Sequence, residues 1–392
     1  MRSRYRINCP PVLRTLTMFL FFSGFLFCNA QNFLVAPFDI SAGVIPSPVK
    51  LAGETHLFYE LHLTNVDSKP WAVLQLEVFS DKADSPLAKY AIPSLRRMFG
   101  HPGLEGSPND PILVGPGSHA ILYLDIRVDG RQTVPGSLKH RFLFSPIGGD
   151  SAKMAPVVVE APLLTVYRQK PLEIRPPVKG GHWVAVNGPS DTSVHRRVWA
   201  VTNGKGHIAQ RFAIDWGKIG EDGHPYHGDP TKNSSWYGYG SEVLAVAQAS
   251  VVEVWDGIPE NTPFQSPAVP ITVETVAGNH IILDLGNGRF ALYAHLKTGS
   301  VRVKVGQKVD AGDVLGLIGN SGNADLPHLH FQVMDANSPL GAEGLPYVFK
   351  TFRLEGVAVI ADLLDPVKTW KPVTPAIEHR DEIPFENAIV AF

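Results

Sequence analysis

Hydrophobic side chains recur at every second residue along short stretches of this chain, and this alternation limits the possible folds more than any other feature. It is clear over residues 57–63, where Leu, Tyr, Leu and Leu occupy the odd positions, and again over residues 120–128. A strand directs successive side chains to opposite faces, so a period of two predicts half-buried β-strands. Gly and Pro, at 36 and 33 of the 392 residues, supply turns such as the one at residues 115–118. The pattern therefore predicts a mostly all-β fold.

The alternating stretches divide into two groups separated by a Pro- and Gly-rich segment. Residues 31–168 contain five or more of them and almost no helical pattern, which is typical of an immunoglobulin-like β-sandwich. Several Pro and Gly residues within residues 169–182 predict a semi-rigid linker. We expect a second strand-rich domain at residues 183–353 and a C-terminal tail at residues 354–392.

Residues 1–30 have the composition of a secretory signal peptide. Four arginines precede an apolar run over residues 16–27, and small residues ending at Ala30 follow that run. The run is too short to span a bilayer comfortably. We expect cleavage near Ala30 and export to the periplasm or the extracellular space, with no transmembrane segment in the mature chain. A lipoprotein is the alternative, although Phe27 stands where lipidation of Cys28 would need a small residue.

Cysteine content and net charge narrow the classes of partner. Both cysteines, Cys9 and Cys28, lie in the predicted signal peptide. The mature chain would therefore have no thiol and would be stabilised by hydrophobic cores rather than by disulfide bonds. The full chain has a formal net charge of −2. Because nucleic-acid binding requires concentrated positive charge, we expect no nucleic-acid partner.

Histidines gather in the second half of the chain, and two of them share one predicted strand. In the segment 327–333, His328 and His330 are two positions apart, so their side chains project from the same face of the strand. An earlier strand pattern, residues 281–295, ends at His295 and is broken by Asn287-Gly288, a strong hairpin signal.

A single carboxylate stands among apolar neighbours in a third predicted strand, residues 210–216. This residue is Asp215. Buried carboxylates are rare unless they are paired or bind a metal. Together with the three histidines, Asp215 would supply nitrogen and oxygen ligands on rigid strands and spare imidazoles for proton transfer. These are the components of a catalytic zinc site.

These residues resemble the lysostaphin-type zinc metalloendopeptidases, which cut peptidoglycan cross-bridges. The resemblance covers residues 187–349 and rests on the following features: Asp215 in its strand, Tyr293-Ala294-His295-Leu296, the Gly-rich stretch 305–322, and Pro327-His328-Leu329-His330-Phe331. It implies an antiparallel β-sheet peptidase domain that uses Zn²⁺. By the same resemblance, Asp215 and His330 are zinc ligands, while His295 and His328 transfer protons.

The sequence departs from this family at the first zinc ligand. The family usually has a histidine four residues before the aspartate, and that position is Arg211 here. Two histidines are candidates to replace it. His207 is closer in sequence but would require a sharp bend of the chain. A hairpin signal at residues 203–206 would fold the preceding segment back and bring His195 opposite residues 212–214, so we favour His195.

The predicted function is an exported zinc metalloendopeptidase that hydrolyses peptide bonds in peptidoglycan cross-links or in another exported peptide. A zinc-bound water and two histidines would perform the hydrolysis. The alternative is a metal-free lysostaphin-like module that binds or regulates cell-wall enzymes, for which Arg211 is the argument. Residues 301–319 also look like half of a biotinyl or lipoyl carrier domain, but no modifiable lysine at a hairpin tip is evident.

Overall fold

The structure is a computed structural model that describes residues 37–102, 112–130, 133–148, 155–365 and 367–392. The predicted signal peptide, with Cys9 and Cys28, lies outside the described residues. Residues 36–392 form one compact unit. The predicted mostly β fold is confirmed, since strands dominate and the described helices are short. No helix among the described residues is long and apolar enough to cross a membrane.

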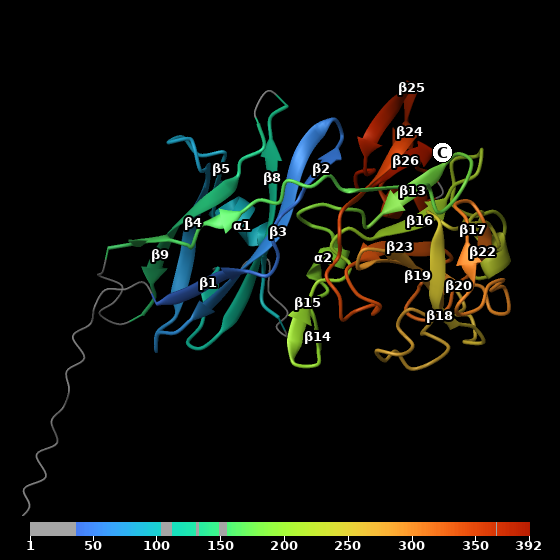
Figure 1. Ribbon diagram of the computed structural model, residues 1–392, viewed down its shortest axis with the longest axis horizontal. Helices are drawn as coiled ribbons and strands as arrows, with labels where there is room; N and C mark the ends of the chain where they lie inside the picture. The colour runs from blue at the N-terminus through green and yellow to red at the C-terminus, as the bar shows by residue number, and fades with distance from the viewer. Residues whose placement is uncertain (1–36, 103–111, 131–132, 149–154, 366) are drawn as a thin grey trace, which may run out of the picture. The chain divides into compact units, whose positions relative to one another are not determined.

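Two antiparallel sheets enclose one hydrophobic core in the N-terminal part (Figure 1). The first sheet contains β1 (Phe38–Ala42), β2 (Pro48–Leu51), β3 (Glu54–Asn65), β6 (Phe99–Gly100) and β8 (His119–Val128). The second contains β4 (Trp71–Ser80), β5 (Ala88–Ala91), β7 (Leu113–Val114), β9 (Ser137–Pro146), β10 (Val157–Glu160) and β11 (Leu164–Thr165). A short helix, α1 (Ile92–Met98), contacts β4, β5 and β8. The immunoglobulin-like character of this sandwich stays a prediction.

Strand β3 is buried on both faces, whereas its alternating pattern predicted one exposed face. Leu57, Tyr59 and Leu61 point into the sandwich core, as expected. Phe58 and Glu60 on the opposite face are also buried. Phe58 packs edge-on against Phe212, with ring centroids 5.8 Å apart. The second face of β3 is therefore covered by the C-terminal part of the chain.

The C-terminal part is built on an eleven-stranded sheet in the order β12-β24-β26-β13-β16-β23-β20-β19-β18-β21, with β25 paired to β24. The strands of this sheet are β12 (Leu172–Ile174), β13 (Trp183–Val186), β16 (Ile214–Lys218), β18 (Ala249–Trp255), β19 (Asn279–Gly286), β20 (Arg289–Leu296), β21 (Lys308–Val309), β23 (Leu329–Met334), β24 (Tyr347–Val357), β25 (Lys371–Glu382) and β26 (Ala388–Ala391). Two small sheets pair β14 (Ala200–Thr202) with β15 (Lys205–His207) and β17 (Glu242–Leu244) with β22 (Val314–Leu317). Two further short helices are α2 (Val194–Arg197) and α3 (Ile360–Leu363).

The large sheet extends beyond the predicted domain of residues 183–353. Strand β12 comes from the predicted linker and pairs in parallel with β24. Strand β24 runs through residue 353, and the C-terminal residues supply β25 and β26. The C-terminal segment predicted as a tail therefore contributes directly to the sheet that carries the site.

Both hairpins expected from the sequence are present. Asn287 and Gly288 join β19 to β20 with φ angles of 55° and 67°. Asn203 and Gly204 join β14 to β15 with φ angles of 51° and 78°. Both turns need positive φ at two successive residues, which Asn and Gly adopt at low cost. The β14–β15 ladder ends at the pair Ala200 and His207, so it is shorter than the sequence suggested.

Strands β16, β23 and β20 lie side by side at the centre of the sheet. Their register sets Asp215 opposite His330, and His330 opposite Ala294. Because strand faces alternate, Leu329 and Phe331 point the other way into the hydrophobic core. The central strands therefore present polar side chains on one face, supported by a tightly packed apolar face behind them.

Candidate metal centre

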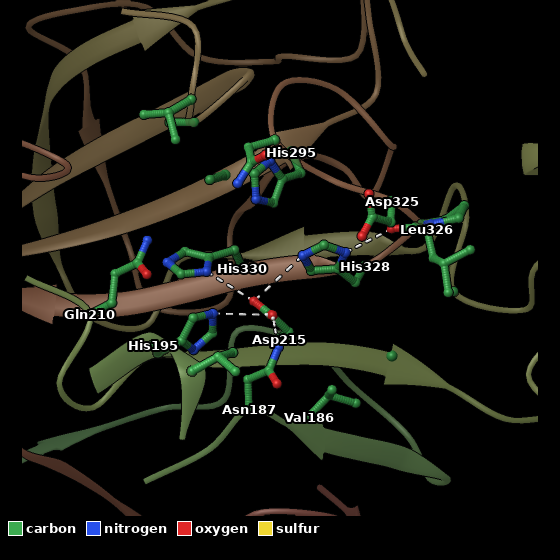
Figure 2. Close-up of a pocket in the computed structure, with 18 of the residues that line it drawn as sticks. Val186, Asn187, His195, Gln210, Asp215, His295, Asp325, Leu326, His328 and His330 are labelled. Atoms are coloured by element: carbon green, nitrogen blue, oxygen red, sulfur yellow. Dashed lines mark hydrogen bonds and ion pairs between the residues drawn. The ribbon is translucent and has the colours of Figure 1, made fainter. Parts of the chain in front are cut away.

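Asp215 and His330 form the centre of the site (Figure 2). They are direct partners in the antiparallel ladder of β16 and β23, and His330 Nδ1 lies 2.9 Å from Asp215 Oδ1. Both side chains are buried. They meet because residues directly opposite each other on paired antiparallel strands project from the same face of the sheet.

His195 approaches the same carboxylate from outside the sheet. It lies in α2, and its Nε2 is 3.2 Å from Asp215 Oδ2. Its Nδ1 lies 3.4 Å from the carbonyl oxygen of Ala213, within the segment that the hairpin argument placed opposite it. One ligand atom each from His195, Asp215 and His330 lies within 4.8 Å of the others.

His207 and Arg211 do not belong to this group. His207 Nδ1 lies 3.2 Å from Glu343 Oε1. Arg211, at the position where the family carries a ligand, is buried and donates from Nε to Glu60 Oε2 at 2.8 Å and from Nη2 to Glu343 Oε2 at 2.9 Å. Arg211 thus has a structural partner on each side, and the structure places His195 rather than His207 beside Asp215.

His295 and His328 line the opposite side of the carboxylate. Their rings are 4.9 Å apart, and His295 lies 5.8 Å from the ring of His330 (Figure 2). His328 Nε2 is 3.5 Å from Asp215 Oδ1. His295 has a φ of 63°, an uncommon conformation for a non-glycine residue and one that often occurs at functional sites.

Each of the four histidines uses its outer ring nitrogen to bind an oxygen acceptor. The acceptor of His195 is the Ala213 carbonyl, and that of His330 Nε2 is Gln332 Oε1 at 2.9 Å. His295 Nδ1 and His328 Nδ1 donate to the carbonyl oxygens of residues 321 and 326, at 2.8 and 2.7 Å. Because an oxygen acceptor requires an N–H donor, the inner nitrogen of each neutral ring presents a lone pair to the site.

Three of these inner nitrogens face the carboxylate of Asp215, which is itself an acceptor. Lone pairs directed at a carboxylate repel it unless a positive charge lies between them. Protons on the imidazoles can supply that charge, and so can a metal cation. The donor set of two imidazoles and one carboxylate, each oriented by a hydrogen bond on its outer side, fits zinc.

The pKa shifts of the site residues also indicate that the surroundings of Asp215 favour positive charge. Burial would raise the pKa of Asp215, but His195 and His328 outweigh it and hold that pKa well below its ordinary value. Burial alone would lower the pKa values of His195 and His328. The Asp215 carboxylate raises both pKa values by more than burial lowers them, so both lie above the ordinary value for histidine. Burial and the neighbouring histidines place the pKa of His295 well below its usual range.

A cavity of about 450 Å³ opens over these residues. Polar groups and apolar side chains both line it, the latter including Val186, Val194, Leu340 and Ile360. Trp236, in the loop between β16 and β17, also borders it but is only 5% exposed and donates from its indole nitrogen to the carbonyl oxygen of Pro230. Trp236 therefore fixes its own loop as one wall of the cavity.

Two supporting residues were not predicted from the sequence. Asn187, at the end of β13, donates from Nδ2 to Asp215 Oδ2 at 2.8 Å. Gln332 holds His330 and donates to the carbonyl oxygen of Pro339. Gln332 continues the two-residue spacing of His328 and His330 along β23, and that period was a signal that could have identified it. Asn187 gave no comparable signal.

Part of the chain matches a known peptidase family. Residues 236–341 match Peptidase family M23, which confirms for this segment the resemblance to lysostaphin-type peptidases. The matched segment contains His295, His328 and His330. It begins after His195 and Asp215, so the atypical ligand region lies outside it.

Individual relatives match only a small share of the chain. The peptidoglycan DD-endopeptidase ShyA of Vibrio cholerae serotype O1 is 35% identical over 89 residues, which cover 22% of this chain and 20% of that protein. Endolysin 2638A of Staphylococcus phage 2638A is 44% identical over 59 residues, which cover 14% of this chain and 12% of that protein. The matched segments therefore span a fifth or less of these two relatives. The catalytic domain of lysostaphin from Staphylococcus simulans matches at 23% identity and a TM-score of 0.23, over 43% of this chain and 88% of that one.

Proposed function

We propose that this chain is an exported zinc metalloendopeptidase that hydrolyses peptide bonds in peptidoglycan cross-links. The observation that carries the proposal is the convergence of His195, Asp215 and His330 on one point beside a cavity. The peptidase family of residues 236–341 supports hydrolysis as the reaction class. The relative named as a peptidoglycan endopeptidase supports peptidoglycan as the substrate, with other exported peptides as the alternative.

His195 Nε2, a carboxylate oxygen of Asp215 and His330 Nδ1 would hold the metal in this proposal. A zinc ion there supplies a Lewis acid that polarises the scissile carbonyl and lowers the pKa of a bound water. Asn187 keeps one carboxylate oxygen of Asp215 oriented, and Gln332 fixes the ring of His330. Such outer contacts hold the ligands in place before the metal arrives.

His295 and His328 are the proton-transfer residues of the proposed mechanism. Each donates its Nδ1–H to a backbone carbonyl, so Nε2 is the atom that accepts a proton from the attacking water. The same carbonyl then stabilises the charged ring. The protonated Nε2 can donate to the leaving amine, which completes the cleavage of the peptide bond.

Export to the periplasm or the extracellular space is part of this proposal and rests on the signal-like composition of residues 1–30. The alternative of a metal-free regulatory module rested on Arg211. Because His195 occupies the place beside Asp215 that Arg211 leaves, that argument loses its force. The histidines needed for proton transfer are also present together.

Digestion of purified peptidoglycan, with the products identified by mass, tests the proposal. We expect the wild-type protein to release peptide-cleaved fragments, a metal chelator to stop the release, and added zinc to restore it. His328→Ala is the matched control. It leaves the three proposed ligands in place, so it should keep zinc but release far fewer fragments. Zinc-loaded wild-type protein that leaves both peptidoglycan and exported peptides intact would contradict the proposal.

A further inference from the structure

A carboxylate from the N-terminal sandwich lies between the two segments that carry candidate metal ligands. Glu60, on β3, is fully buried and forms ion pairs with both Arg196 and Arg211. Arg196 is the residue after His195, and Arg211 precedes Asp215 by four residues. The side chain of Glu60 therefore contacts both the segment that carries His195 and the segment that carries Asp215.

Among the described contacts of helix α2, those with the large sheet that carries Asp215 and His330 are made by His195 itself. The residue before the helix, Ser193, donates to the carbonyl oxygen of Asn187, and His195 itself makes the 3.4 Å contact with Ala213. The helix is a single turn with no side-chain cap at its N-terminus. A helix of this length has little stability of its own, so tertiary contacts must fix its position.

Most of those tertiary contacts come from the sandwich. Arg196 donates to Glu60 Oε1 at 2.8 Å and to the carbonyl oxygens of Tyr59 and Leu124 at 3.2 and 3.1 Å. Its guanidinium lies 5.2 Å from the ring centroid of Phe58. The next residue, Arg197, stacks on Tyr123 of β8 at 4.0 Å and donates to the carbonyl oxygen of residue 97.

We infer that Glu60 is a positioning residue for the metal centre, acting through Arg196 to hold His195 against Asp215. The inference rests on the proposed zinc site and adds a role for the sandwich within it. Arg196 donates to four oxygens at once, three of which lie on the two neighbouring strands β3 and β8 of the sandwich. A planar guanidinium held in this way fixes the direction of its backbone, and therefore that of His195.

The charges of Glu60 and its two arginines also favour a fixed position for Arg196. Burial alone would raise the pKa of Glu60, but Arg211 and Arg196 outweigh it and lower that pKa, so the carboxylate is ionised. Glu343 supplies the second negative charge, on the far side of Arg211. Without the charge of Glu60, Arg211 keeps its contact with Glu343, whereas Arg196 has no other carboxylate contact among the described ion pairs.

The test compares Glu60→Gln with Tyr59→Phe in the full chain. Tyr59 is the neighbouring residue on β3, and its hydroxyl faces the sandwich core and His140, so Tyr59→Phe perturbs the sandwich without touching α2. Zinc dissociation constants are measured by competition with a chromophoric chelator. The absorption bands of Co²⁺ bound in place of zinc report the coordination directly.

We expect Glu60→Gln to weaken zinc binding by about 10- to 100-fold and to change the Co²⁺ spectrum in the way that His195→Ala does. Tyr59→Phe should match the wild type in both measurements. Arg196→Lys keeps the positive charge but cannot reach all four oxygens, so it gives a second variant with the same expected loss if Glu60→Gln does not fold.

Wild-type zinc affinity in a folded Glu60→Gln or Arg196→Lys protein would overturn the inference. An equal loss in Tyr59→Phe would also overturn it, because the effect would then be general destabilisation of the sandwich. A wild-type protein that binds no zinc would instead contradict the proposed function, so the two failures are distinguishable.

Discussion

Arg211 Nε lies 2.8 Å from Glu60 Oε2, in an ion pair whose carboxylate comes from the N-terminal sandwich and whose guanidinium precedes the β16 strand of the site. Both side chains are buried. At the position of Arg211 the lysostaphin-type family usually carries a zinc ligand. The arginine has therefore taken a structural role there, while His195 approaches Asp215 from a different part of the chain.

Replacing Arg211 with the usual histidine should not improve the site. Arg211→His removes one of the two guanidiniums that pair with the buried carboxylate of Glu60, and we expect the free energy of unfolding to fall by about 3 kcal/mol, because Arg196 still pairs with that carboxylate. Zinc affinity should not rise. Chemical denaturation and zinc titration check both points, with Lys368→Met, which breaks an exposed ion pair with Asp362, as a nearly neutral control. Tighter zinc binding with unchanged stability would argue that Arg211 merely displaced a ligand.

His330 on β23 and His328, the residue directly before that strand, should differ in their effects. His330→Ala removes a proposed ligand, so bound zinc and hydrolysis should both be lost. His328→Ala should keep zinc and lower turnover by about 10²- to 10⁴-fold, because it removes a proton-transfer group. Metal analysis and peptide-release assays on the same preparations separate the roles. A zinc-loaded, fully active His330→Ala protein would refute the ligand assignment.

Gln332 should control metal affinity without touching the metal. Gln332→Leu keeps a similar volume but removes the acceptor that fixes the ring of His330, so zinc affinity should fall by about 10- to 100-fold. Gln248→Leu is the control, because it makes the same substitution at a glutamine whose amide donates to Asp310 outside the site, and it should bind zinc like the wild type. Equal affinities for all three proteins would show that Gln332 has no such role.

His140 should make the stability of the protein depend on pH. Burial in the sandwich lowers the pKa of His140 to about 4, and its Nε2 lies 2.7 Å from the Tyr59 hydroxyl. The unfolded chain, with an ordinary histidine pKa near 6.5, binds the proton first as the pH falls. The free energy of unfolding should therefore decrease by about 3 kcal/mol between pH 6.5 and pH 4 through this group.

Denaturation curves across that pH range measure the effect. In His140→Gln the decrease should be smaller by the same amount, because the titrating ring is gone. Tyr59→Phe keeps the ring and should keep the pH dependence. An unchanged slope in His140→Gln would show that another group is responsible.

Local patterns predicted much of the fold. The period of two marked the strands, and the Asn-Gly pairs marked both hairpins with their positive φ angles. Hydrophobic alternation indicates which side chains of a strand point into the core of its own domain. It did not reveal that the other face of β3 is also covered. The contact between Glu60 and Arg196 joins residues 136 positions apart, and no periodic signal identifies such a pair.

The site was predicted unevenly for the same reason. The His-x-His spacing of His328 and His330 is a local signal, because two residues that are two positions apart in an extended chain project to the same side. His195 was reached only through the hairpin argument, and the single-turn helix that carries it is too short to give a hydrophobic pattern. Asn187 contributes through tertiary structure alone, since its partner Asp215 is 28 residues away.

The zinc content of purified wild-type protein, compared with His195→Ala and His207→Ala, tests the central claim most directly. We expect about one tightly bound zinc per chain in the wild type and in His207→Ala, and loss of that zinc in His195→Ala. His207 is the matched control because it is a partly buried histidine with a carboxylate partner outside the site. Wild-type protein without zinc after loading, or full retention of zinc by His195→Ala, would contradict the account.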